Sequence, residues 1–236
     1  MALKLGDKSI TNIYVGDKSI VNIYMGEKLI YSKDNGGGES TSIPYLEQTA
    51  ISGRTRIDIK YTPTNTSRYE IGFLPDLTKN WTTNKHLFGG WNSSSSAYGL
   101  AVYLTKNSST SYTINWKHGS TTNNNKTIEM SNNKMQVVTL SKDEFTVNGV
   151  DYTGTQATPS LKYGLFLFNT QQSGSTPSTN TAFIGRIYYF KVYEGDTLVR
   201  DLIAHLDDAG KPCMMDTLTG TCYYESGTTG YITYGE

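Results

Sequence analysis

Residues 185–203 read GRIYYFKVYEGDTLVRDLI and lie in the last quarter of a chain of 236 residues. A run of β-branched and aromatic residues covers 183–193, and a second run of the same kind covers 198–203. Between them Glu194-Gly195-Asp196 has turn character, because glycine and aspartate favour the backbone conformations of tight turns. The stretch therefore predicts two antiparallel strands joined by a short turn.

Similar strand signals fill the chain from residue 43 onward, and no comparable helix pattern accompanies them. One of them, 54–61, alternates polar and apolar residues, so one of its faces is expected to be wet and the other buried. Asn148-Gly149 favours a two-residue type I′ hairpin, and 216–220 separates another pair of short runs. The predicted strands are 54–61, 69–74, 86–91, 98–104, 112–117, 135–140, 144–147, 150–152, 161–168, 183–193, 198–203, 213–215 and 221–224. We expect an all-β fold, a sandwich of two sheets closed as a jelly roll.

Composition excludes several classes of protein. Twenty-one Lys and Arg balance twenty-one Asp and Glu, and charged residues make up 18% of the chain, so nucleic acid and anionic membranes are not expected partners. An aromatic share of 12%, with 18 Tyr, is too high for a disordered chain. Neither a signal-peptide apolar region nor an apolar run long enough to span a membrane is present, so we expect synthesis in the cytoplasm.

The first 31 residues repeat with a period of ten. LGDKSITNIY (5–14) is followed by VGDKSIVNIY (15–24) and MGEKLIY (25–31), and each unit predicts one short strand and one tight turn. Three such strands bury little surface unaided, so the segment either folds back on its own domain or is completed by another chain. We favour the second interpretation, an anchor. Its candidate contact residues are Ile10, Ile13, Tyr14, Ile20, Ile23 and Tyr24.

A linker separates this repeat from the rest of the chain. Residues 32–42 contain three consecutive glycines among polar residues, a composition typical of flexible tethers. The predicted organisation is therefore a repeat at 1–31, a linker at 32–42 and a jelly-roll domain at 43–236.

The third segment resembles a known family. The resemblance rests on IPYLE (43–47), TRIDI (55–59), FGG (88–90), the 185–203 stretch, DDAG (207–210), MDTLTG (215–220) and SGTTG (226–230). These resemble the concanavalin A-like, laminin-G-like jelly-roll domains common in virion proteins of gut bacteriophages and their prophages. The decapeptide units are similar to the Gly-Asp repeats that precede such domains in phage fibre and tail proteins. The resemblance implies the fold strongly and the function weakly, since the same sandwich carries lectins, glucanases and inert spacers.

Catalytic patterns are missing from the sequence. A glucanase on this fold would need carboxylates on alternate residues of one strand, and the nearest approach, Glu194 with Asp196, sits in a predicted turn. Asp143 and Glu144 are adjacent and would point to opposite faces of a strand. There is no nucleophile elbow, and the three histidines lie in unrelated segments. We predict no catalytic residue and a protein that is not an enzyme.

Metal and redox chemistry have weak candidates. Asp207 and Asp208 could offer two oxygens to calcium, but a solvated hairpin loop explains them equally well, so we predict no metal and no cofactor. Cys213 and Cys222 fall on neighbouring predicted strands, where a disulfide would fit. Because there is no export signal, two small thiols are the favoured interpretation.

A glycan site is harder to dismiss. Trp81, Trp91 and Tyr98 flank loops rich in Asn, Ser and Thr, which could stack against a sugar and bond its hydroxyls. Trp116 instead alternates with Ile114 along one strand face, so we expect it in the core.

The sequence thus favours a bacteriophage virion structural protein, a fibre or decoration anchored by its repeat and displaying a lectin-like domain for host or glycan adhesion. A dedicated tail receptor-binding or carbohydrate-binding module is the alternative, and a glycan-cleaving enzyme comes last. Expected partners are capsid, neck or tail proteins, sister chains in a trimer or dimer, and a neutral host-surface glycan. The expected location is the virion.

Overall fold

The fold was analysed on a computed structural model of the chain. It describes residues 4–5, 8–9, 13–15, 18–20, 22–25, 28–32, 43–49, 55–81, 83–92, 95–119, 122–129, 134–159, 161, 164–170, 181–227 and 229–236. For residues 1–42 and 91–98 the description is limited to the backbone. The chain divides into two compact units, Met1–Ser42 and Ile43–Glu236, and each is described by itself.

The described residues of the first unit form three separate two-stranded antiparallel hairpins. They are β1 (Lys4–Leu5) with β2 (Lys8–Ser9), β3 (Ile13–Val15) with β4 (Lys18–Ile20), and β5 (Asn22–Met25) with β6 (Lys28–Ser32). The predicted count of one strand per repeat is therefore wrong. Each Gly-Asp or Gly-Glu pair falls between two paired strands, so the residues on both sides of one turn pair with each other.

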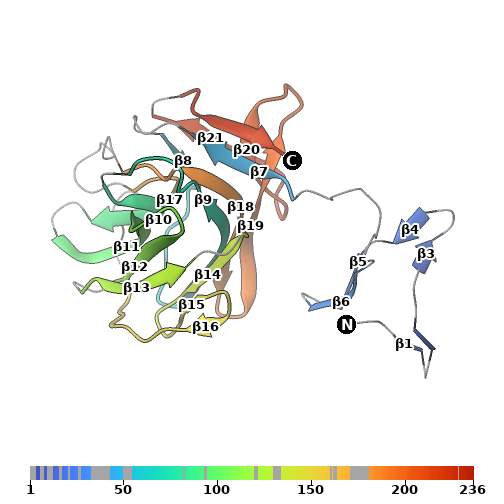
Figure 1. Ribbon diagram of the computed structural model, residues 1–236, viewed down its shortest axis with the longest axis horizontal. Helices are drawn as coiled ribbons and strands as arrows, with labels where there is room; N and C mark the ends of the chain where they lie inside the picture. Colours follow the sequence, from blue (N-terminus) through green and yellow to red (C-terminus); the bar gives the residue numbers. More distant parts are fainter. Residues whose placement is uncertain are drawn as a thin grey trace. The chain divides into compact units, whose positions relative to one another are not determined.

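The second unit is built from β-strands alone in the part that the structure describes (Figure 1). Its strands are β7 (Tyr45–Gln48), β8 (Arg56–Asp58), β9 (Ser67–Pro75), β10 (Lys85–Asn92), β11 (Ser95–Lys106), β12 (Ser111–His118), β13 (Asn124–Glu129), β14 (Gln136–Leu140), β15 (Phe145–Val147), β16 (Val150–Asp151), β17 (Phe166–Leu167), β18 (Gly185–Glu194), β19 (Thr197–Leu206), β20 (Pro212–Asp216), β21 (Thr221–Ser226) and β22 (Ile232–Gly235).

These strands form two packed layers. One layer has the order β13-β12-β11-β10-β17-β8, and the other has the order β21-β20-β19-β18-β9-β14-β15-β16. β7 pairs with both β18 and β22, and the two layers are joined at one edge where β21 pairs with β8. All of these pairings are antiparallel. The predicted all-β jelly-roll sandwich is confirmed.

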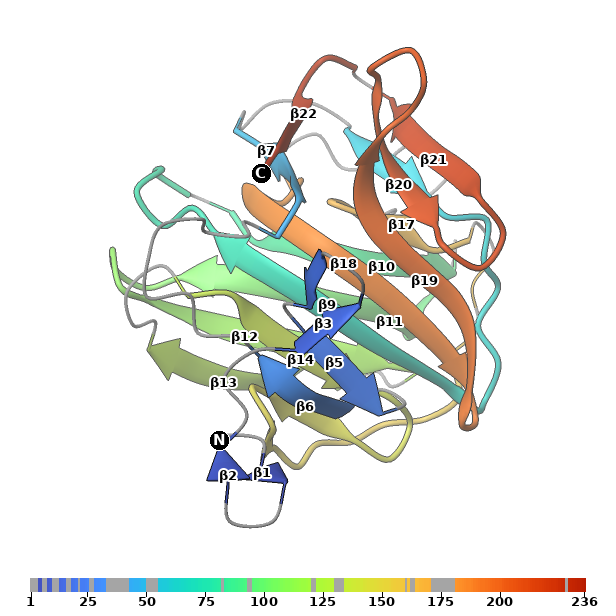
Figure 2. The same cartoon turned by 90° about the vertical axis from the view of Figure 1, so that its right-hand side faces the viewer.

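The 185–203 stretch forms the hairpin predicted for it. β18 runs between β9 and β19, and Figure 2 shows these three long strands side by side. Gly195 closes the turn with a φ of 57°, in the left-handed region that favours glycine. The type I′ hairpin at Asn148 and Gly149 is also confirmed, since both have positive φ and Val147 pairs with Val150.

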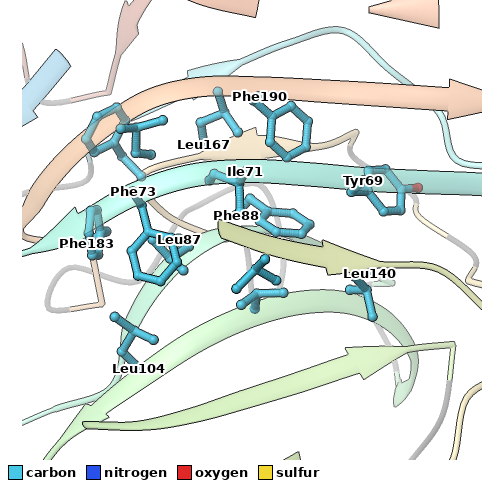
Figure 3. Close-up of a cluster of buried hydrophobic side chains, with 14 of the residues drawn as sticks. Tyr69, Ile71, Phe73, Leu87, Phe88, Leu104, Leu140, Leu167, Phe183 and Phe190 are labelled. Carbon is cyan, nitrogen blue, oxygen red and sulfur yellow. The ribbon is translucent and has the colours of Figure 1, made fainter. Parts of the chain in front are cut away.

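Aromatic rings from both layers meet in the core. The ring of Phe88 on β10 lies 5.1 Å from that of Phe190 on β18 and 5.7 Å from that of Tyr69 on β9. Figure 3 shows these side chains between the ribbons of the two layers. Trp116 is buried as predicted, and its ring stacks at 3.8 Å on that of Phe145. Burial of such rings is the main stabilisation of the sandwich.

Three strands lacked a usable sequence signal. β13 reads NNKTIE and buries one hydrophobic side chain, that of Ile128, so it has no period-two pattern. β7 and β22 are four residues each and depend on pairing with each other and with β18. Conversely, among the described residues of the strand predicted at 161–168, Phe166–Leu167 form β17.

Candidate functional site

A hollow of about 550 Å³ opens beside β18. Three parts of the chain contribute to it: β7 and β18, the turn that follows β9, and the turn between β11 and β12. Its lining residues are Glu47, Leu74, Pro75, Asp76, Leu77, Thr78, Ser109, Thr110, Gly185, Arg186 and Tyr188. We call this hollow the Arg186 groove. It combines an aromatic ring, charged groups and hydroxyls in one concave surface.

A β-bulge determines the position of the aromatic ring. Ile187 pairs with Phe73 and Tyr189 pairs with Gly72, which leaves Tyr188 as an extra residue in β18. In a regular strand two consecutive side chains would point to opposite faces of the sheet. A bulge changes this alternation, and here Tyr188 and Tyr189 are both partly exposed. Two adjacent tyrosine rings are therefore presented on the outer face.

Arg186 is fixed in place on two sides. Its Nε donates a hydrogen bond of 3.1 Å to Glu47 Oε1, and its guanidinium carbon lies 4.2 Å from the centre of the Tyr45 ring. Burial lowers the pKa of Arg186, but the hydrogen bond and charge of Glu47 outweigh burial and raise it overall. The ring of Tyr45 meets the Tyr188 ring edge-on at 5.7 Å. Since a guanidinium has five N–H donors, one bond to Glu47 does not exhaust it.

Oxygen atoms line the other side of the groove. Asp76 Oδ1 accepts hydrogen bonds from the amide and the hydroxyl of Thr78, at 3.0 and 2.6 Å, which fixes the turn after β9. Ser109 and Thr110 belong to the turn between β11 and β12, where the Thr110 amide donates to Ser108 Oγ at 3.1 Å. Short polar turns held by their own hydrogen bonds are rigid enough to orient hydroxyl and carboxylate groups toward a ligand.

A second hollow of about 410 Å³ adjoins the same bulge, and Tyr188 lines both hollows. Its lining residues are Ile43, Pro44, Glu70, Tyr188, Tyr189, Lys191, Asp201, Ile203 and Ala204. We call it the Ile203 hollow. Its lining is more apolar than that of the Arg186 groove, although charged residues are included.

The predicted anchor residues lie on the hairpins of the first unit, except Ile10, which is outside the described residues. In the backbone register Ile13 is the partner of Ile20, while Ile23 is the partner of Tyr31 and Tyr24 that of Leu29; Tyr14 is opposite Ser19. The anchor role stays a prediction.

The aromatic residues predicted to bind glycan are not brought together as a described site. Trp81 lies in the hydrophobic core with 8% of its surface exposed, so its ring offers little face for a sugar to stack on. Trp91 is the second-last residue of β10 and Tyr98 lies within β11, and their side chains are outside the described part of the structure. The polar residues beside Trp81 in the sequence suggested an exposed ring, but the ring is packed in the hydrophobic core.

Two of the candidate acids, Glu194 and Asp207, have local structural partners. Glu194 accepts hydrogen bonds from the hydroxyls of Thr66 and Ser67, at 2.8 and 2.7 Å, and from those of Tyr61 and Thr64. Burial raises the pKa of Glu194. These bonds tie the β18–β19 turn to the segment before β9.

Asp207 has a similar role in its own loop. It accepts hydrogen bonds from the amides of Ala209 and Lys211, at 2.9 and 2.8 Å, and from the Tyr224 hydroxyl at 2.8 Å. The Lys211 amide, and then the Tyr224 hydroxyl, lower the pKa of Asp207. Among the described residues no group of three or more His, Cys, Asp or Glu is placed to hold a metal ion.

Sequence reasoning missed the Arg186 groove, although two signals were present. Tyr45 and Glu47 alternate on the short run that opens the domain, as do Arg186 and Tyr188 on the long run that pairs with it. The doublet of Tyr188 and Tyr189 breaks the alternation of the long run. A break of this kind in an otherwise regular strand indicates a bulge, and bulges often occur beside binding sites.

No protein-family model and no curated protein sequence matches the chain. Among solved structures, it is similar to a candidate carbohydrate-binding protein from Bacteroides ovatus, at 10% identity and a TM-score of 0.54 over 82% of this chain and 59% of that one. A heptameric SAP-like pentraxin from Limulus polyphemus has 10% identity and a TM-score of 0.49 over 66% of this chain and 78% of its own. Domains LG4-5 of the mouse laminin alpha1 chain have 10% identity and a TM-score of 0.43 over 77% and 48%. At such low identity the likeness shows the fold alone.

The chain is therefore similar in fold to the Bacteroides protein, and it spans 59% of that protein's length. In the described part of the chain no helix is long and apolar enough to cross a membrane.

Proposed function

We propose that this protein is a glycan-binding display protein of a bacteriophage particle. In this proposal residues 1–31 attach the chain to other virion proteins or to sister chains, and the jelly-roll unit binds a host-surface glycan. The protein acts by adhesion and not by cleavage. We also propose that the protein is located on the virion, that it forms a trimer or a dimer, and that it is not an enzyme.

The Arg186 groove is the main structural support for the proposed glycan binding. Sugar rings have apolar faces and a rim of hydroxyls, so a protein binds them with an aromatic face and a few fixed donors and acceptors. The groove offers the ring of Tyr188, donors on Arg186 and acceptors on Glu47 and Asp76. The turns that supply the remaining hydroxyls are held by their own hydrogen bonds, which reduces the entropy lost on binding.

The proposed attachment to a virion is supported by the sequence. The decapeptide repeat resembles the units that precede jelly-roll domains in phage fibre and tail proteins, and the body resembles those domains. The hairpins of the first unit are two to five residues per strand, too short to be stable in isolation. A partner chain that adds strands or covers the edges would stabilise them.

The glycan-binding part is tested with the full chain on an array of bacterial capsular and mucin-type glycans, followed by calorimetric titration of any hit. We expect Tyr188→Ala and Arg186→Ala each to weaken binding on the order of tenfold, the loss of one stacking or one charge-assisted contact. Leu218→Ala removes an exposed apolar side chain, 51% accessible, on the β20–β21 turn and serves as the control. Glycan affinities that are the same for the native protein and both groove variants would refute the assignment of the site.

The attachment part needs a separate experiment. Residues 1–42 fused to a fluorescent reporter should be incorporated into particles when expressed during infection, whereas the same fusion with Ile13→Asp and Ile23→Asp should not. Failure of the unmodified fusion to enter particles would contradict the anchor role.

A further inference from the structure

The Ile203 hollow and the Arg186 groove share one lining residue, Tyr188. We propose that the two hollows form one extended site, and that the Ile203 hollow takes a methyl-bearing sugar unit, 6-deoxy or N-acetylated, of the same oligosaccharide. This inference rests on the proposed glycan-binding function and specifies the class of ligand.

The bulge in β18 gives the two hollows a shared wall. Tyr189 is paired with Gly72 on β9 and with Ile203 on β19. A Cβ atom on Gly72 would come within 2.4 Å of Tyr189 Cε1, so the Tyr189 ring lies directly over the glycine. Because that position has no side chain, the ring can lie close to the sheet. Ile203 then remains half-exposed beside the ring and forms part of the hollow.

The apolar lining favours a methyl group over a hydroxyl group. Ile43, Pro44 and Ile203 present hydrocarbon to the hollow, and Ile43 is 53% exposed. A sugar hydroxyl placed there would lose its hydrogen bonds to water without gaining others. A methyl group at the same place would gain about fourfold in affinity from the apolar surface that it buries.

Charged side chains further restrict the ligand. In the Ile203 hollow Lys191 stands in cross-strand register between Glu70 and Asp201, so two carboxylates face one ammonium group. The Arg186 groove likewise contains two carboxylates, Glu47 and Asp76, and one guanidinium. Each hollow therefore has an excess of one negative charge. A sugar with a carboxylate would be repelled by both, so the site favours neutral sugars.

The test uses the full chain with matched sugars that differ in the group of interest. Saturation-transfer NMR at millimolar concentration compares D-fucose with D-galactose, and N-acetyl-D-glucosamine with D-glucose; glucuronic acid tests the charge argument. We expect at least one methyl-bearing sugar to bind several-fold more tightly than its partner. The two pairs distinguish a 6-deoxy from an N-acetyl group.

The variant Ile203→Ser should remove this preference, so that a methyl-bearing sugar and its matched partner bind with equal affinity. Val150→Ser, which replaces an exposed apolar residue of β16 with 55% accessibility, should leave the preference intact. Sugar binding that depends on Tyr188 but shows no methyl preference would overturn the inference and leave the proposed function standing. Absence of any sugar binding would overturn both. A change of oligomeric state in Ile203→Ser, measured by light scattering, would show a second copy in the hollow and would also overturn the inference.

Discussion

Acidification should destabilise the jelly-roll unit through one buried histidine. His86 on β10 is 2% exposed, and its ring stacks on that of Tyr103 at 4.9 Å. Its Nδ1 has no hydrogen-bond partner in the part of the chain that the structure describes. Burial, with a smaller contribution from the charge of Lys85, lowers the pKa of His86 from 6.5 to about 3. The folded protein therefore keeps His86 neutral at pH values where the unfolded chain takes up a proton.

The sign and size of the effect follow from this difference. The contribution of His86 to stability is complete above pH 6.5 and decreases as the pH falls toward 3, because the unfolded state binds the proton first. At pH 5, one and a half pH units below the pKa of the unfolded chain, the loss is about 2 kcal/mol, roughly thirtyfold in the unfolding equilibrium. Burial also lowers the pKa of His118, which adds to the loss.

Urea unfolding at pH 8 and pH 5, followed by tryptophan fluorescence, measures the loss; Trp81 and Trp116 are both buried. The variant His86→Phe keeps an aromatic ring beside Tyr103 but cannot titrate, so it should lose about 2 kcal/mol less than the native protein over this range. His205→Gln changes a half-buried histidine and is the matched control. The reasoning would be refuted if the native protein and His86→Phe lost the same free energy of unfolding between the two pH values.

Three further outcomes are expected. Glu194→Ala removes an acceptor shared by four hydroxyls and should lower the free energy of unfolding by about 2 kcal/mol in urea; an unchanged midpoint would contradict its structural role. Gly72→Ala should displace the ring of Tyr189 and reduce the preference for methyl-bearing sugars, as measured by NMR, with little effect on the urea midpoint. Because burial raises the pKa of Cys213 to about 12, iodoacetamide at pH 8 should label Cys222 first, and mass spectrometry showing equal rates would disprove this.

The sequence predicts most of the fold because the strands in the core carry their own signal. The 185–203 stretch combines apolar runs with a turn at Gly195, and burial of one face fixes the register of such strands. β13 lacks this signal because Ile128 is its one buried hydrophobic side chain. Its position follows from pairing with β12, which is a tertiary interaction that the residues of β13 do not encode alone.

The candidate site was less predictable, for a physical reason. Aromatic residues occur both in cores and on binding surfaces, and residue type does not distinguish the two uses. Trp81 sits among polar residues in the sequence but is buried, whereas Tyr188 sits in a core-like run but is half-exposed. One extra residue in β18 decides the orientation of Tyr188, and a prediction based on strict alternation misses it.

In the proposed function, the pairing of β7 has a mechanical consequence. The chain enters the jelly-roll unit at Ile43, and β7 is hydrogen-bonded on one side to β18 and on the other to β22. Glu47 of β7 also contacts Arg186 in the groove. Tension between a bound ligand and the N-terminal segment would pass through these neighbouring strands and bypass most of the sandwich. The backbone hydrogen bonds of β7 to both β18 and β22 would have to break before β7 separated from the sheet. This arrangement would resist mechanical unfolding under load.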